Sequence, residues 1–161
     1  MSGDIKIIWS PSLMEGDFEF SNSINDLTGD AGIGTAIVIS LFSDRRASDD
    51  DILPDVNNLD KRGWWGDLGF PEFEEDRIGS KLWLLGREKT LDSVLMKAKS
   101  YAEEALQWMI DDGVAIKIEV SVERVGVIGT DILALLVEIY REFGGKRTYK
   151  YELQWTAQSS Y

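Results

Sequence analysis

Residues 91–123 read LDSVLMKAKSYAEEALQWMIDDGVAIKIEVSVE, and within them the hydrophobic pattern changes from a helical to a strand period. Up to Asp112, apolar residues recur three and four positions apart, as on one face of an amphipathic helix. They are Leu91, Val94, Leu95, Ala98, Tyr101, Ala102, Ala105, Leu106, Met109 and Ile110. Gly113 suits the left-handed residue that ends many helices. From Val114 to Glu123 apolar and polar residues alternate, which predicts a half-buried strand.

Two further strands are predicted towards the C-terminus. The first runs from about Asp131 to Phe143, and the second follows the glycine pair Gly144 and Gly145, which is typical of a hairpin turn. One face of these strands is apolar, with Leu133, Leu135, Val137, Ile139, Tyr149, Tyr151, Leu153 and Trp155. Because helix and strands come in separate runs, the class is α+β. We expect a long amphipathic helix packed on a three-stranded antiparallel sheet.

The N-terminal third predicts a smaller hairpin and a second helix. Short strands are expected from Asp4 to Trp9 and around Phe18 to Phe20. Asp30 then stands where a helix cap would, before apolar residues spaced by four, namely Ile33, Ile37 and Leu41. The β-branched residues 37–39 leave a buried strand open, but length and the cap favour a helix. We expect one domain over residues 1–161, with a long irregular loop at about 44–79.

Composition excludes several functional classes. The chain has 161 residues, with 17 basic and 29 acidic side chains and a net charge of −12, which disfavours nucleic acid as a partner. It has no Cys and no His, so a disulfide framework, a Ser-His-Asp relay and a conventional zinc site are excluded. The acidic N-terminus is unlike a signal peptide, and the nearly apolar residues 31–42 are shorter than the ~20 residues of a membrane span. We expect a protein made in a cytoplasm, with no membrane partner, metal or cofactor.

Other motifs are better explained as ordinary structure. The glycines of residues 29–34 lack the spacing of a dinucleotide or phosphate loop. The acidic residues 49–60 have no glycine where a calcium loop needs its sharp turn, so a solvated loop is favoured. A sugar-binding platform at Trp64 and Trp65 remains a minor alternative. With 29 acidic residues, no carboxylate pair can be selected for glycosidase chemistry.

The irregular loop is the best candidate for a binding surface. It brings together Arg45, Arg46 and Arg62 with the adjacent Trp64 and Trp65. Arginine and tryptophan dominate the energetic hot spots of protein interfaces. The alternative is that these arginines form surface ion pairs with Asp44, Asp67 and their neighbours. The final strand offers a second contact route, because a sheet edge presents unpaired backbone groups.

Four sequence words, in this order and spacing, resemble the baseplate family of Mu-like contractile-tailed phages typified by gene product 46. They are LFSDRRA at 41–47, RGWWGD at 62–67, IGSKLWLLGREK at 78–89 and ALQW at 105–108. The resemblance runs from Asp4 to about Leu153. The family is similar to the sheath-initiating wedge proteins of T-even phages. Those relatives carry a Glu-Pro-Arg word after the long helix, where this chain has residues 111–114, Asp-Asp-Gly-Val, so no contact of that word is transferred.

The resemblance implies a structural subunit of a contractile phage tail baseplate, active in wedge assembly and sheath initiation, and no enzyme. Its partners would be other baseplate wedge proteins and tail sheath or tube-proximal subunits, and its location the virion tail after synthesis in the bacterial cytoplasm. Candidate partner-binding residues are Arg45, Arg46, Arg62, Trp64, Trp65, Asp67, Trp83 and Arg87. Two alternatives are a carboxylate-dependent cell-wall hydrolase and an acidic regulatory adaptor that binds one host protein.

Overall fold

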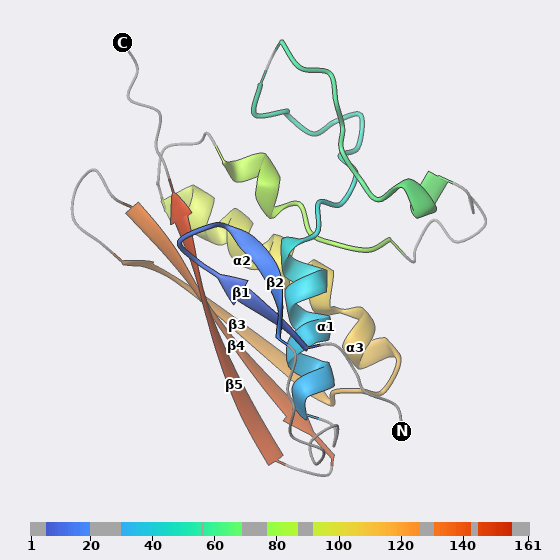
Figure 1. Ribbon diagram of the computed structural model, residues 1–161, viewed down its shortest axis with the longest axis vertical. Helices are drawn as coiled ribbons and strands as arrows, with labels where there is room; N and C mark the ends of the chain where they lie inside the picture. The colour runs from blue at the N-terminus through green and yellow to red at the C-terminus, as the bar shows by residue number, and fades with distance from the viewer. Residues whose placement is uncertain are drawn as a thin grey trace.

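The computed structural model describes residues 6–19, 30–55, 57–68, 77–86, 92–125, 131–142 and 145–155. Its centre is an antiparallel sheet in the order β3-β4-β5. The three strands are β3 (Lys117–Val125), β4 (Asp131–Arg141) and β5 (Gly145–Trp155). Figure 1 shows the helices on one side of this sheet, and the α+β prediction is confirmed.

The core lies between the sheet and the helices, and the alternation of β4 determines which face is buried. Leu133, Leu135, Val137 and Ile139 are all buried, as their period of two predicts. Leu135 lies opposite Val122 of β3 and Tyr151 of β5 in the ladder. Fully burying a side chain of this size contributes about 1.5–3 kcal/mol, so this row of β4 stabilises the sheet against the helices.

The long predicted helix forms two helical elements, with a tighter turn near its C-terminal end. It comprises α2 (Asp92–Leu106) and the short α3 (Trp108–Asp111), separated at Gln107. The Gln107 N–H donates to the Glu104 carbonyl oxygen, a spacing of three residues instead of four. Gln107 keeps helical angles, φ −57° and ψ −36°, so the axis continues and both Leu106 and Met109 are fully buried. The predicted start at Leu91 lies outside the described residues.

The predicted phase of the next strand is wrong at its start. The alternation from Val114 to Glu123 predicts that Ile116 lies on the apolar, buried face, yet its exposed fraction is 64%, whereas that of Ala115 is 2%. The Ala115 N–H donates to the Met109 carbonyl at 2.8 Å, which turns Ala115 towards the core and Ile116 away from it. The regular alternation begins only with β3, where Val120 is buried.

The N-terminal part forms the predicted helix and hairpin. Helix α1 (Asp30–Phe42) buries Ile33, Ile37 and Leu41, so the helix interpretation of this stretch is confirmed over the strand. Strands β1 (Lys6–Ser10) and β2 (Glu15–Glu19) pair antiparallel. Phe20 and the predicted turn residue Gly144 lie outside the described residues.

An aromatic contact attaches the hairpin to both α1 and the last strand. The Trp9 ring stacks on that of Phe42, with centroids 3.8 Å apart and planes 12° apart, and Phe42 meets the edge of Tyr151. The Trp9 Nε1–H donates to the Glu152 carbonyl oxygen at 3.2 Å. The first and last strands of the chain are therefore joined through side chains rather than through a continuous sheet.

Between α1 and α2 the described chain forms two 3₁₀ turns, η1 (Trp65–Leu68) and η3 (Leu82–Leu85), joined by irregular segments. In Figure 1 this part lies beyond one end of α1. Within the described residues, no helix has the length and apolar content needed to cross a bilayer.

Candidate partner-binding surface

Two segments far apart in the sequence lie side by side at the end of α1. Asp44 and Ser80 form an isolated parallel bridge. The Arg45 N–H donates to the Ser80 carbonyl at 3.0 Å, and the Ser80 N–H donates to the Ser43 carbonyl at 2.9 Å. This pairing fixes where the irregular segment leaves the helix and where it returns.

The pairing of these two segments requires a glycine at position 79 and uses the hydroxyl of Ser80. Gly79 has φ +97°, and a Cβ on it would lie 2.4 Å from the Ser43 carbonyl oxygen, so no side chain fits. The buried Ser80 hydroxyl donates to the Leu41 carbonyl at the end of α1 and accepts from the Leu82 N–H at the start of η3. The Ser80 side chain thus links the end of α1 to the start of η3.

We expect Ser80→Ala to lower the free energy of unfolding by about 1–3 kcal/mol, because it leaves two buried backbone groups unsatisfied. Urea denaturation measures the loss. Ser100→Ala, at an exposed position of α2, is the matched control and should change stability by less than about 0.5 kcal/mol. Equal effects of the two substitutions would contradict the role of the Ser80 hydroxyl.

Arg62 and Trp83 form the centre of the candidate surface. The guanidinium carbon of Arg62 lies 4.5 Å from the centre of the Trp83 ring. Its Nη1 is 2.8 Å from Oδ2 of Asp44, and the Trp83 indole N–H donates to the Arg45 carbonyl at 2.8 Å. The cation–π contact and the ion pair together hold the Arg62 guanidinium over the Trp83 ring.

Arg46 packs against the backbone of Arg62 and Gly63. Gly63 has φ +102°, and a Cβ on it would lie 2.6 Å from Cβ of Arg46. Arg46 donates through Nη1 to the Arg62 carbonyl at 3.3 Å. The neighbouring Ala47 N–H donates to the Lys61 carbonyl at 2.9 Å. These contacts hold the irregular segments around Arg46 and Arg62 next to each other.

Arg45 contacts its own chain. Its Nη1 is 3.1 Å from Oε1 of Glu104 on α2, and its side chain is only 18% exposed. Arg45 therefore attaches the candidate surface to the long helix. The alternative expectation, that the arginines form surface ion pairs with Asp44, Asp67 and their neighbours, describes the Arg62 pair with Asp44 but not Arg45, whose partner Glu104 lies on α2.

Trp64 and Trp65 are the exposed part of the surface. Their ring centroids are 5.3 Å apart with planes tilted by 48°, and the residues are 45% and 79% exposed. Gly66 makes this arrangement possible, because a Cβ there would lie 2.2 Å from the Trp64 ring. A pair of indoles this open is typical of a binding surface and unusual for a core.

Asp67 and Arg87 complete the predicted set. Asp67 lies in η1, its N–H donates to the Trp64 carbonyl at 3.1 Å, and its Oδ2 is buried with no hydrogen bond within the described part of the chain. Arg87 lies outside the described residues. Six of the predicted residues therefore lie in the described segment from Arg45 to Asp67. Trp83, which comes later in the chain, packs against Arg62 of this segment.

Sequence reasoning missed the contacts that hold residues 48–51. Asp51 accepts from both the N–H and the hydroxyl of Ser48, and Lys81 lies 2.7 Å away, with the two charged side chains 16% and 18% exposed. Lys61 pairs with Asp49. Burial raises the pKa of Asp51, but the hydrogen bonds from Lys81 and Ser48 outweigh it and hold the pKa below 3.8. An acidic run gives no signal of which carboxylate will be paired.

Because the pKa of Asp51 is lowered on folding, its carboxylate stabilises the fold above the ordinary value of 3.8, and the contribution is lost as pH falls through the folded value. We therefore expect wild type to be more stable than Asp51→Asn at pH 7, and the difference to shrink as pH falls through the folded pKa, which lies below the ordinary value. Chemical denaturation at a series of pH values measures it. A difference that persists unchanged at low pH would contradict this role.

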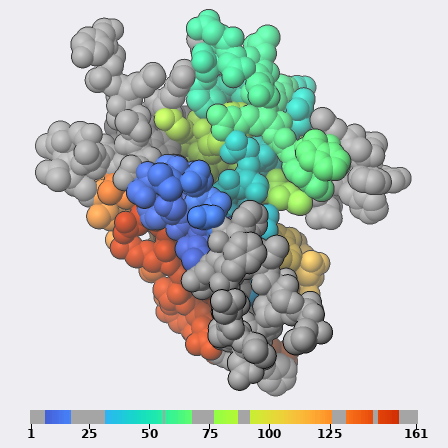
Figure 2. Space-filling view, in the orientation of Figure 1, coloured from blue at the N-terminus to red at the C-terminus, as the bar shows by residue number. Residues whose placement is uncertain are grey.

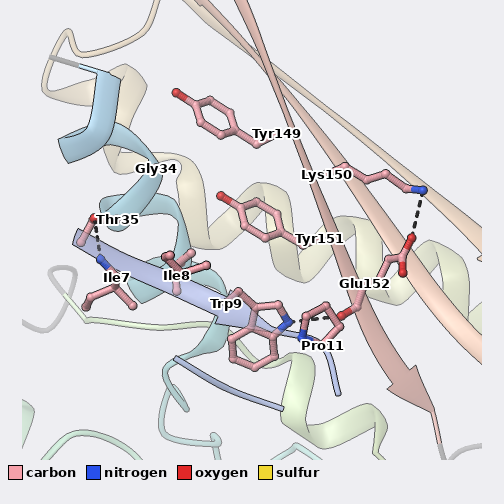
Figure 3. A pocket seen from close by; sticks show the side chains of 11 residues that line it. Ile7, Ile8, Trp9, Pro11, Gly34, Thr35, Tyr149, Lys150, Tyr151 and Glu152 are labelled. Atoms are coloured by element: carbon pink, nitrogen blue, oxygen red, sulfur yellow. Dashed lines mark hydrogen bonds and ion pairs between the residues drawn. The ribbon is translucent and has the colours of Figure 1, made fainter. Parts of the chain in front are cut away.

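A cavity of about 390 Å³ lies between the hairpin, α1 and β5. Figure 3 shows Tyr149 and Tyr151 projecting into it from β5, with Ile7, Ile8 and Trp9 of β1 below them in the view. Burial, with a smaller contribution from Tyr149, raises the pKa of Tyr151, so its hydroxyl stays protonated. No group of three acidic side chains in the described ranges is placed to hold a metal ion. None of the predicted partner-binding residues that the structure describes lines this cavity.

Comparisons with known proteins agree on one family. Residues 33–146 match the model of the family described as "Phage protein GP46". The chain is 42% identical over 121 residues to "Baseplate protein gp46" of Escherichia phage Mu, covering 75% of this chain and 77% of the relative. It is 37% identical over 135 residues to "Mu-like prophage FluMu protein gp46" of Haemophilus influenzae, covering 83% and 87%. No solved structure gives a significant match.

Proposed function

Because the chain belongs to the GP46 family of phage proteins, we propose that it is a structural subunit of a contractile phage tail baseplate. In this role it takes part in wedge assembly and in initiating the sheath, and it acts through protein contacts rather than catalysis. Its partners are other baseplate wedge proteins and the sheath or tube-proximal subunits beside them. It is made in the host cytoplasm and works in the virion tail.

The observation that supports this proposal best is the exposed Trp64 and Trp65 pair on a fixed base. Large exposed aromatic groups are costly in water unless a partner covers them, and tryptophan is the residue type most enriched in interface hot spots. Gly66 shapes the pair, and the Arg62 stack on Trp83 holds the chain that precedes it. A binding surface that is already ordered loses little conformational entropy when it binds.

The predicted residues divide into two roles within this surface. Trp64, Trp65 and the half-exposed Arg62 side chain contact the partner. Arg45 and Trp83 are positioning residues, because their polar groups bind Glu104 and the backbone of this chain. Arg46, Asp67 and Arg87 remain proposed contact residues.

Deletion and complementation in the phage or prophage that encodes the chain test the role. Without the gene we expect no contractile tails in induced lysates seen by negative-stain electron microscopy, and a plasmid copy should restore them. The restored particles should contain the protein by mass spectrometry. Normal tails without the gene would contradict the proposal. So would clearing of a cell-wall substrate by the purified protein that a single Asp or Glu substitution abolishes.

A further inference from the structure

Three of the large hydrophobic side chains in the described residues are more exposed than any other, and all three lie within residues 52–65. Ile52 and Leu59 are each 85% exposed, and Trp65 is 79% exposed. The two aliphatic side chains belong to residues 48–55 and 57–60, which we call the lobe. Figure 2 shows this segment, teal to green, projecting from the top of the molecule. Single exposed apolar residues are ordinary, but two such open side chains on one projection, a few residues before the exposed Trp65, indicate a contact surface.

Hydrogen bonds within the lobe hold its shape. The Asn57 N–H donates to the Asp55 carboxylate at 3.0 Å, and the Asp60 N–H donates to the Asn58 side chain at 3.0 Å. The Arg62 N–H donates to the Asp60 carboxylate at 2.8 Å. At the other end, Asp51 is held by Ser48 and Lys81. The lobe therefore presents Ile52 and Leu59 from a series of closed turns.

The charge of the lobe selects the kind of partner. It contains five aspartates, at positions 49, 50, 51, 55 and 60, and no basic residue. Lys61 and Lys81 pair with Asp49 and Asp51, so the lobe and these two lysines together keep a net charge of −3. A surface that binds the lobe must supply apolar pockets and also suit this negative charge, so lysines and arginines are expected around the pockets. A second copy of this chain is disfavoured, because each copy carries a net charge of −12.

We propose that the lobe inserts Ile52 and Leu59 into an apolar pocket, rimmed by basic side chains, on a different subunit of the same assembly. This inference rests on the proposed baseplate function and extends the contact made by Trp64 and Trp65. The aliphatic side chains supply the buried area, and the carboxylates orient the approach and select a basic surface.

Site-specific photo-crosslinking in assembled particles tests the proposal. A photoreactive phenylalanine analogue is placed at position 52 or 59, with position 65 as a reference and the exposed Met96 on α2 as a control. We expect positions 52 and 59 to crosslink to a peptide of another subunit that carries lysine or arginine nearby. Crosslinks to a second copy of this chain, or none where position 65 gives one, would overturn the proposal. A crosslink at position 65 alone would overturn the role of the lobe but not the proposed baseplate function.

Incorporation into particles gives a quantitative test. Wild type and Ile52→Ser/Leu59→Ser are expressed in equal amounts, and mass spectrometry measures their ratio in purified tails. We expect the variant to be depleted about tenfold or more, because burial of each aliphatic group is worth at least about a tenfold affinity. Asp50→Lys should also be depleted, whereas Met96→Ser should enter equally. Equal incorporation of the lobe variant, with unchanged melting temperature, would overturn the proposal.

Discussion

Replacing Trp64 and Trp65 together by alanine is expected to abolish contractile tails in a complementation assay. Truncating a hot-spot residue commonly costs at least ~2 kcal/mol of binding free energy, so losing both weakens an interface by about a thousandfold. Trp65 is 79% exposed in the isolated chain, and its removal leaves the core untouched. Counting tails by electron microscopy in induced lysates measures the effect.

The single substitution Trp65→Ala separates binding from folding. Trp64 is only 45% exposed and packs over Gly66, so its loss also disturbs η1. Trp65→Ala should melt within a few degrees of wild type and still reduce tail number by at least tenfold. Met96→Ala, an equally open apolar position on α2, should do neither. Normal tail numbers with Trp65→Ala would remove this pair from the binding surface.

Replacing Gly79 by alanine is expected to lower the free energy of unfolding by about 3 kcal/mol or more. Its φ of +97° costs a residue with a side chain about 1–2 kcal/mol. The added Cβ would also lie 2.4 Å from the Ser43 carbonyl oxygen, so the backbone must separate and the hydrogen bonds between residues 43–45 and Ser80 weaken. Urea denaturation of the two proteins measures the difference.

Gly113→Ala is the matched control for this prediction. Gly113 also has positive φ, +72°, but nothing lies within 4 Å of a Cβ built there. We therefore expect it to cost about 1 kcal/mol, from the backbone angle alone. If both variants lose the same stability, the close approach of Gly79 to Ser43 does not contribute to the fold.

Local patterns in the sequence were sufficient to predict most of the fold. The buried row from Leu133 to Ile139 follows from a period of two, and α1 follows from apolar residues spaced by four. The period of two fails at Ile116 because a bond from the Ala115 N–H back to the Met109 carbonyl, at the end of the helix, changes the phase at the start of the strand. Periodicity contains no information about such a bond.

The candidate site could be predicted only as a set of residue types. Arginine and tryptophan content identified the segment, but not that Arg45 would bind Glu104, nearly sixty positions away, while Trp65 stayed exposed. The composition of the acidic run indicates a solvated loop, and only the structure distinguishes Asp51, which forms a partly buried ion pair with Lys81. These distinctions depend on tertiary packing, which sequence spacing does not encode.

The most direct test of the central claim is hydroxyl-radical footprinting of Trp65 in the free protein and in purified tails. Oxidation of its indole measures solvent exposure, and Met96 serves as the internal reference because it is also open. If this protein works by being bound through the tryptophan pair, Trp65 oxidation falls at least severalfold in the particle while Met96 is less affected. Equal oxidation of Trp65 in both states, or absence of the protein from the tails, would contradict the account.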